Sequence, residues 1–256
     1  MDADTYKRLA VAAKVFRKSR ESGACMYPEL EGVTCSAPAI RSHSVGKKAH
    51  LSRIAEDGHV LGHSRTADAM LFGSGAPSTG MTKIGIQTAS TFRGFCGKHD
   101  DQLFAPVDQS PVPMVPESVA LLAYRAFALE LHAKWSTFSA MRKQMGGPPL
   151  EEMLATGLPL HPLICGLRDM IGEKARWDRV LLNSEYQDVR FHAIRFTETP
   201  EVLGSVVLAP RVDFAERELQ SPSPSQHAEY LAASVLPDGE HGLVVIAWLK
   251  SSNQVA

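Results

Sequence analysis

The chain has 256 residues, enough to bury a sizeable core and to form one or two domains. With 44% hydrophobic and 21% charged residues, its composition is that of an ordinary soluble globular protein. The net charge is −1, but residues 1–100 carry a balance of +5 and the remainder a balance of −6. This asymmetry permits a nucleic-acid contact in the first half, although scattered solvated charge produces the same balance.

Four cysteines in a chain of this length do not form a disulfide framework. The acidic start, Met-Asp-Ala-Asp-Thr, lacks the apolar segment of a signal peptide. No apolar run reaches the roughly 18 residues that a membrane span needs. We therefore expect a cytoplasmic protein without membrane contact, in which paired cysteines bind metal more often than they form disulfides.

The first sixty residues alternate between helical and loop-like stretches. Residues 4–20 predict a helix with an apolar stripe and a basic remainder, which either contacts phosphate or is simply solvated. Residues 21–42 are loop-like and contain two cysteines. A short helix is expected over 46–57, with His43 at or just before its start, and a short strand at Val60-Leu61. We expect the neighbouring histidines to be exposed: His50, His59 and His63.

Residues 62–90 are rich in Gly, Ser, Thr and Ala, and the segment Phe72–Gly80 within them predicts a flexible loop. Their Gly73-Ser-Gly-Ala-Pro sequence lacks the Lys-Ser/Thr of a phosphate-binding P-loop. Ser90-Thr91-Phe92 then predicts a strand that enters a tight turn at Gly94-Phe95-Cys96. A short helix follows, anchored in the core by Leu103 and Phe104.

The second half begins after four prolines within residues 105–116, which predict a boundary between a domain at 1–105 and a domain at 117–256. A long helix is expected over 117–145, ending at Gly146-Gly147, and a second over 163–183. The two form an antiparallel hairpin in the simplest arrangement. The expected buried seam of the first helix alternates steps of three and four: Leu121, Tyr124, Ala128, Leu131, Trp135 and Phe138.

The periodicity then changes to two, which predicts strands. We expect four of them, at 189–196, 202–208, 230–235 and 243–249, with Asp238-Gly239 in a turn. The fold class is therefore α+β: a zinc-stapled N-terminal module is followed by a helical hairpin packed on a small, mainly antiparallel sheet.

A set of three thiols and one imidazole suggests a metal site. Cys96 and His99 are three residues apart on a predicted turn, and Cys25 and Cys35 lie upstream. Such a set holds structural Zn²⁺ in tetrahedral geometry. The alternative is that some of these cysteines are small buried residues. Cys165, in an apolar part of the second long helix, is expected in the core.

The pattern Cys…Cys…Ser-His-Ser…Phe-Cys-Gly-Lys-His-Asp resembles the treble-clef zinc fold, and within it the HNH (ββα-metal) endonucleases. It also resembles uncharacterised bacterial zinc proteins with a Cys…Cys…His…Phe-Cys-x-x-His-Asp pattern. The resemblance covers less than half of the chain. It implies that His43 is the general base that activates water and that Cys96 and His99 form the second ligand pair.

The sequence departs from the HNH pattern at three points. Ser42 stands where the Asp of the Asp-His pair is usual, residues 60–90 contain no Asn, and the second ligand pair is Cys-x-x-His. His43 is thus a base, a zinc ligand in place of Cys25 or Cys35, or a structural residue. Asp100 is either a carboxylate for Mg²⁺ or Mn²⁺ or the N-cap of a helix that begins at 101.

Two functions follow from these alternatives. The favoured one is a zinc-stabilised module that binds nucleic acid through its basic half, or a protein partner. The other is a metal-dependent endonuclease, which requires His43 and a carboxylate at an open cleft. The expected lining of that cleft is basic: Arg41, Lys47, Lys48 or Arg53.

Overall fold

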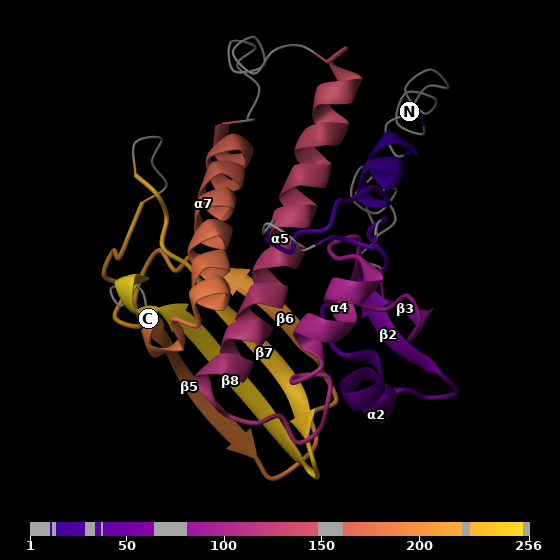
Figure 1. Ribbon diagram of the computed structural model, residues 1–256, viewed down its shortest axis with the longest axis vertical. Helices are drawn as coiled ribbons and strands as arrows, with labels where there is room; N and C mark the ends of the chain where they lie inside the picture. Colours follow the sequence, from indigo (N-terminus) through magenta and orange to yellow (C-terminus); the bar gives the residue numbers. More distant parts are fainter. Residues whose placement is uncertain are drawn as a thin grey trace.

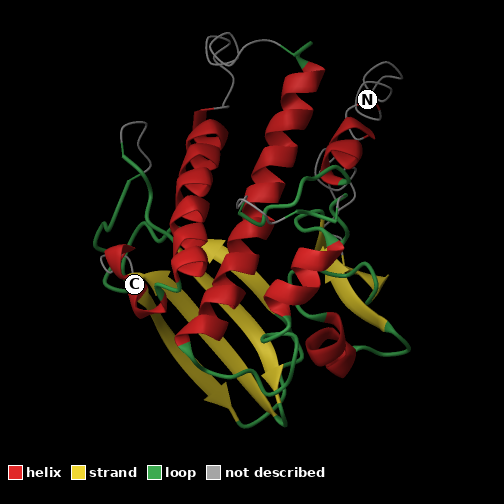
Figure 2. Ribbon diagram, viewed as in Figure 1, coloured by secondary structure: helices red, strands yellow, loops and turns green. Residues whose placement is uncertain are grey.

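The computed structural model confirms a mixed α+β protein (Figures 1 and 2). No helix in the part of the chain that it describes is long and apolar enough to cross a membrane. Part of the predicted 4–20 helix and all of the predicted loop at 72–80 lie outside that part. The described residues are 11, 14–28, 34–36, 38–63, 81–147, 161–221 and 226–252.

The C-terminal half contains a four-stranded sheet in which every neighbouring pair is antiparallel, as predicted. The strand order is β5-β8-β7-β6, so the hairpin of β7 and β8 is central. Gly239, with φ of +62°, makes the turn of this hairpin, where a residue with a side chain would be strained. The strands are β5 (Val189–Phe196), β6 (Gly204–Leu208), β7 (Leu231–Asp238) and β8 (His241–Leu249).

Two long helices lie side by side over one face of this sheet (Figure 1). Helix α5 (Pro116–Gln144) contacts all four strands, and helix α7 (His161–Asn183) packs against α5. Proline is at the first position of α5, where its missing N–H has no partner to lose. The predicted helical hairpin is therefore present, and a short 3₁₀ turn, η2 (Tyr186–Asp188), leads from α7 into β5.

The buried stripe of α5 differs from the prediction in its second half. Tyr124 and Ala128 are buried as expected, but Trp135 is 53% exposed. The residues buried beyond Ala128 are His132, Ser136 and Ala140, each four residues after the last. A repeated spacing of four residues moves the buried stripe gradually around the helix, away from the predicted seam. The reason is that the end of α5 packs on α7 and on the chain near Ser22 rather than on the sheet.

The N-terminal half is built from short elements beside α5. A two-residue strand β1 (Ser42–His43) pairs with β4 (Thr91–Phe92), and β2 (His59–His63) pairs with β3 (Met81–Gly85). No strand was predicted at β3, whose polar and glycine-flanked sequence shows no strand periodicity. The helices are η1 (Lys47–Leu51), α2 (Ser52–Ile54) and α4 (Gly97–Phe104), and residues 14–20 are also helical.

One cluster of buried hydrophobic residues runs from Val45 through both long helices to Leu249. Aromatic rings connect its parts: Phe95 lies 5.0 Å from Phe104 and 6.0 Å from Tyr124 of α5, measured between ring centroids. The proline-containing stretch between 105 and 116 contributes Val107 and Val112 to the same cluster. The division into domains 1–105 and 117–256 stays a prediction.

A buried ion pair joins α5 to the turn after α4. Arg125 donates two hydrogen bonds to the Asp108 carboxylate, at 2.8 and 2.9 Å, and its guanidinium lies 4.0 Å above the Phe104 ring. The Arg125 side chain is 3% exposed, whereas Asp108 is 40% exposed. Only the arginine is therefore fully removed from water, and it depends on this single carboxylate.

We expect Asp108→Ala to lower the free energy of unfolding by about 3 kcal/mol, because it leaves the buried Arg125 guanidinium without its carboxylate. Arg179→Ala is the control, since Arg179 is 63% exposed in its pair with Glu185 and should contribute less than about 1 kcal/mol. Chemical denaturation of both variants measures the difference. Equal effects would contradict a special role for the pair of Arg125 and Asp108.

Candidate metal centre

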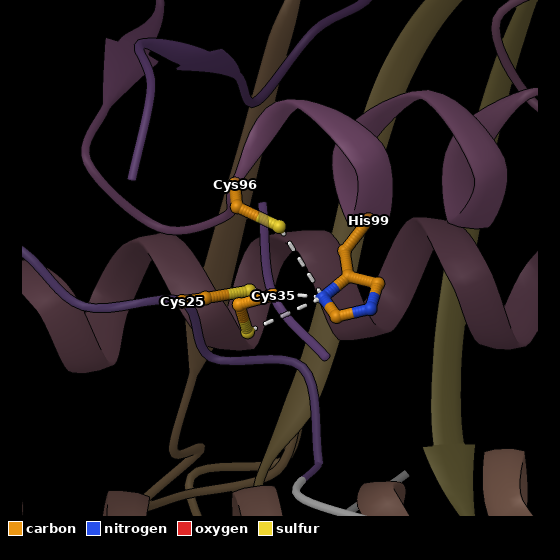
Figure 3. Close-up of side chains that lie close together, drawn as sticks. All are labelled: Cys25, Cys35, Cys96 and His99. Atoms are coloured by element: carbon orange, nitrogen blue, oxygen red, sulfur yellow. Dashed lines mark hydrogen bonds between the residues drawn. The ribbon is translucent and has the colours of Figure 1, made fainter. Parts of the chain in front are cut away.

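The four predicted ligands come together in space (Figure 3). Their ligand atoms all lie within 4.8 Å of one another. The sulfurs of Cys25, Cys96 and Cys35 lie 3.3, 3.4 and 3.7 Å from Nδ1 of His99. A tetrahedral zinc ion with ordinary bond lengths separates its sulfur and nitrogen ligands by about 3.5 Å. The cluster therefore has the spacing of a tetrahedral ligand shell and is able to hold a metal such as zinc.

The first turn of α4 positions two of the ligands. Cys96 has extended backbone angles and precedes the helix, while His99 lies one turn later and is buried. The Asp100 N–H donates to the Cys96 carbonyl and begins the helical hydrogen-bonding pattern. The unpaired N–H groups at a helix start favour negative charge, so this place suits a thiolate.

The backbone beside Cys25 is fixed by contacts of the next residue, Met26, through both its N–H and its carbonyl group. The Met26 N–H donates to the Gly94 carbonyl at 2.7 Å, and the Tyr124 hydroxyl lies 2.8 Å from the Met26 carbonyl. Tyr124 also lies 2.7 Å from Oδ1 of Asp178 on α7. Since Tyr124 belongs to α5, the loop that carries Cys25 is tied to both long helices.

Cys35 belongs to a short stretch that docks on the start of α4. The Lys98 N–H donates to the Ser36 hydroxyl at 3.2 Å, and the Lys98 ammonium lies 3.4 Å from the Thr34 carbonyl. Cys35 itself is exposed, unlike Cys96. The cluster is thus closed on the protein side and reachable by solvent through Cys35.

The pKa shifts of the residues in the cluster favour a bound cation. Burial lowers the pKa of His99, which keeps its imidazole neutral, as metal binding requires. Burial alone would raise the pKa of Cys96, but hydrogen bonds from the Ser36 hydroxyl and the His99 N–H lower it to about 7. Burial and the neighbouring thiols raise the pKa of Cys25 to about 11. The Cys96 thiolate therefore forms near neutral pH, whereas Cys25 needs a positive charge beside it to ionise.

The outer nitrogen of His99 has an unusual environment. Its Nε2 is buried and has no hydrogen-bond partner in the part of the chain that is described. Metal-binding histidines commonly donate this N–H to a carboxylate or carbonyl. Here the Tyr27 ring stacks on the imidazole instead, at 4.2 Å between centroids and 22° between planes. The orientation of the ring is therefore set by stacking.

His43 lies outside the four-residue cluster. It is in β1 opposite Thr91, and its Nδ1 is buried without a hydrogen-bond partner among the described residues. Burial lowers its pKa, and the charges of Lys47 and Arg125 lower it further. His43 is thus a neutral imidazole with one free nitrogen.

Asp100 lies in the first turn of α4, which begins at Gly97 with Cys96 at the capping position. The alternative that Asp100 caps a helix starting at 101 was therefore wrong. Burial raises the pKa of its carboxyl and the Ser42 hydroxyl opposes this shift, although Asp100 Oδ1 makes no well-formed hydrogen bond. Among the described residues, the one group of three or more metal-binding side chains contains no carboxylate.

The other histidines and basic residues only partly match expectation. His50 is 1% exposed rather than solvated, because its Nε2 lies 3.0 Å from the Val107 carbonyl where η1 docks on the turn after α4. His59 is exposed as expected, whereas the side chain of His63 lies outside the described part.

The basic residues expected to line a cleft differ in their surroundings. Arg41 and Lys48 are exposed, but Lys47 donates to Gln87 and Arg53 contacts Gly239 and Glu240.

Sequence reasoning missed three residues that build the centre: Tyr27, Ser36 and Tyr124. Tyr27 and Ser36 lie within two residues of a cysteine, so proximity in the chain was available as a criterion. Tyr124 is about a hundred residues away from Cys25, and its helical seam position predicts only burial. Only the structure shows that its hydroxyl lies 2.8 Å from the carbonyl of Met26, the residue next to Cys25.

Comparison with protein-family models, curated proteins and solved structures finds no match to this chain. The identity of the fold therefore rests on the residues themselves. They support a Cys₃His cluster able to hold a metal, whereas the treble-clef and HNH assignments remain hypotheses.

Replacing one buried ligand should remove the metal. We expect wild-type protein to carry about one zinc ion per chain and Cys96→Ser to lose it, together with thermal stability, because metal binding and folding are coupled. Elemental analysis and a melting curve on the same preparation measure both.

Cys165→Ser is the matched control, because Cys165 lies half-buried on α7 outside the cluster. It should leave the zinc content unchanged. Zinc loss from Cys165→Ser, or a Cys96→Ser protein that is metal-free and equally stable, would contradict the ligand assignment.

Proposed function

We propose that this protein is a zinc-stabilised module whose basic N-terminal half binds nucleic acid. The observation that carries the proposal is the geometry of the Cys₃His cluster. Zinc held by Cys25, Cys35, Cys96 and His99 would fasten the stretches around Cys25 and Cys35 to the start of α4 and would fix the surface that they form. The zinc would be structural, since four protein ligands leave no open position for substrate.

The charges on that half support a polyanionic partner. Up to residue 100, the described chain carries eleven Lys and Arg residues against four Asp and Glu residues. Lys98 lies between two of the ligands and is exposed. Basic side chains on a fixed surface bind phosphates in a way that does not depend on base sequence. The other exposed basic residues of this half are Lys14, Arg17, Lys18, Arg41, Lys48, Arg53 and Lys83.

The second candidate is the HNH-like, metal-dependent endonuclease. One observation favours it: His43 is neutral, and its Nδ1 has no hydrogen-bond partner among the described residues, so this nitrogen is able to accept a proton. In that mechanism His43 would deprotonate water, and Asp100 would hold Mg²⁺ or Mn²⁺ against the scissile phosphate. We prefer the binding function because no second carboxylate joins Asp100 in a metal-binding group within the described residues.

Nucleic-acid binding should be salt-dependent and should map to the N-terminal half. We expect the double variant Arg41→Ala/Lys48→Ala to bind labelled DNA or RNA more weakly in fluorescence anisotropy, with a salt slope lower by about 1 for each lost phosphate contact. Lys250→Ala is the control, because Lys250 is exposed in η3 (Lys250–Ser252) of the other half. Absence of binding at low salt would refute the proposal and leave a protein partner as the target.

His43→Ala separates binding from catalysis. Under the proposal it keeps zinc and nucleic-acid affinity, and neither wild type nor variant nicks DNA or RNA in Mg²⁺ or Mn²⁺. Nicking by wild type that falls 10²–10⁴-fold in His43→Ala would establish the endonuclease instead. A simultaneous loss of zinc would identify His43 as a ligand.

A further inference from the structure

The four-stranded sheet has one face that no described helix or strand covers, although Glu198 and Pro200 reach over Gly242 at one of its ends. Helix α5 lies on the other face, against Val245, Ala247 and Leu249 of β8 (Figure 1). Because side chains alternate along a strand, Val244 and Ile246 point away from α5. Both lie outside the buried core cluster, as expected for residues on the opposite face. We call this opposite face the outer face.

The outer face is apolar across all four strands. The register places Ile194 beside Val244, Val244 beside Val235, and Val206 beside Ala233. The strands at the two edges present the most exposed residues, with Ile194 51%, Phe196 44%, Val206 46% and Leu208 47% exposed. A contiguous apolar surface that spans a sheet is unusual for a monomer and marks an interaction site.

The near absence of charged side chains on the outer strand positions indicates which kind of partner this face binds. Of the outward-facing positions on the four strands, only Arg190 and His192 carry ionisable side chains, both near the start of β5. No carboxylate belongs to these outward-facing strand positions. A surface that is nearly neutral offers little to nucleic acid or to a charged protein, but it is complementary to another apolar sheet.

The area is sufficient for a pair of sheets. Strands of five to nine residues, with a rise of about 3.3 Å per residue and a spacing of about 4.8 Å, give a face of roughly 450 Å² in projection. Side-chain relief increases the accessible area, so two such faces bury about 1,000 Å² in total. This is the lower limit for a specific interface, which indicates a weak dimer.

We infer that the outer face binds a second copy of this chain, sheet against sheet. Two twisted sheets pack about 10 Å apart with strands within about 30° of each other. A two-fold axis that lies between the two sheets pairs the same apolar strands of both copies face to face. The dimer would leave the metal centre of both copies free, since α4 is not part of the sheet.

Analytical ultracentrifugation of the full chain tests this inference. Between about 1 and 200 μM, wild type should shift from the 27.9 kDa of one chain toward twice that mass, with micromolar affinity. The double variant Ile194→Glu/Val206→Glu should weaken self-association on the order of 100-fold or more, because each charge is buried in both copies. Both positions are about half exposed in one chain, so the fold should tolerate the change.

Two further variants keep the test decisive. Ile194→Thr/Val206→Thr retains strand-favouring residues and should weaken the dimer in the same direction if the charged variant does not fold. Leu61→Glu places the same charge on another exposed apolar residue, 65% exposed on β2, and should leave the dimer intact. A wild type that stays monomeric at 200 μM, or a dimer that survives both outer-face variants, would overturn the inference. So would a dimer that Leu61→Glu dissociates.

Discussion

Three sulfur atoms that crowd around one imidazole nitrogen are a constraint on the whole N-terminal half. The sulfurs lie within 3.7 Å of Nδ1 of His99, and burial opposes charge on Cys25 and Cys96. A dication resolves this conflict, because it compensates the thiolates and uses the neutral imidazole as a ligand. β1 and β4 share only two residue pairs, so zinc would add a strong link to the few backbone hydrogen bonds that join the short elements around the cluster.

The same constraint reaches the C-terminal half through one side chain. Tyr124 is fully buried, packs against Phe95 and brings its hydroxyl to the Met26 carbonyl beside Cys25. Asp178 of α7 lies beside the same hydroxyl, and its carboxylate accepts a hydrogen bond from the Lys174 ammonium. The loop that carries Cys25 and the helices α5 and α7 are therefore linked through the Tyr124 hydroxyl. Its hydrogen bonds are shielded from water, and such bonds are stronger than those at the surface. Order at the metal centre and packing of the helical hairpin depend on each other.

How far the sequence predicts this structure depends on whether a local pattern determines the outcome. Cys96 and His99 are one helical turn apart, so their convergence follows from local geometry. The strand at 189–196 follows from strict alternation, and its bounds match the observed β5. His50 and Trp135 were misplaced because their burial depends on where η1 and α5 dock, which no periodicity encodes. Strand β3 was missed because its pairing with β2, rather than its own composition, makes it a strand. The function of His43 is beyond sequence reasoning for the same reason, since it depends on which groups converge on its free nitrogen.

The central claim is that three thiolates and one imidazole of this chain hold zinc. X-ray absorption at the zinc edge of the purified protein counts the ligand atoms and measures their distances. The account predicts three sulfur atoms at about 2.3 Å and one nitrogen at about 2.0 to 2.1 Å. A shell made only of oxygen and nitrogen atoms, or one with fewer than three sulfurs, would contradict it.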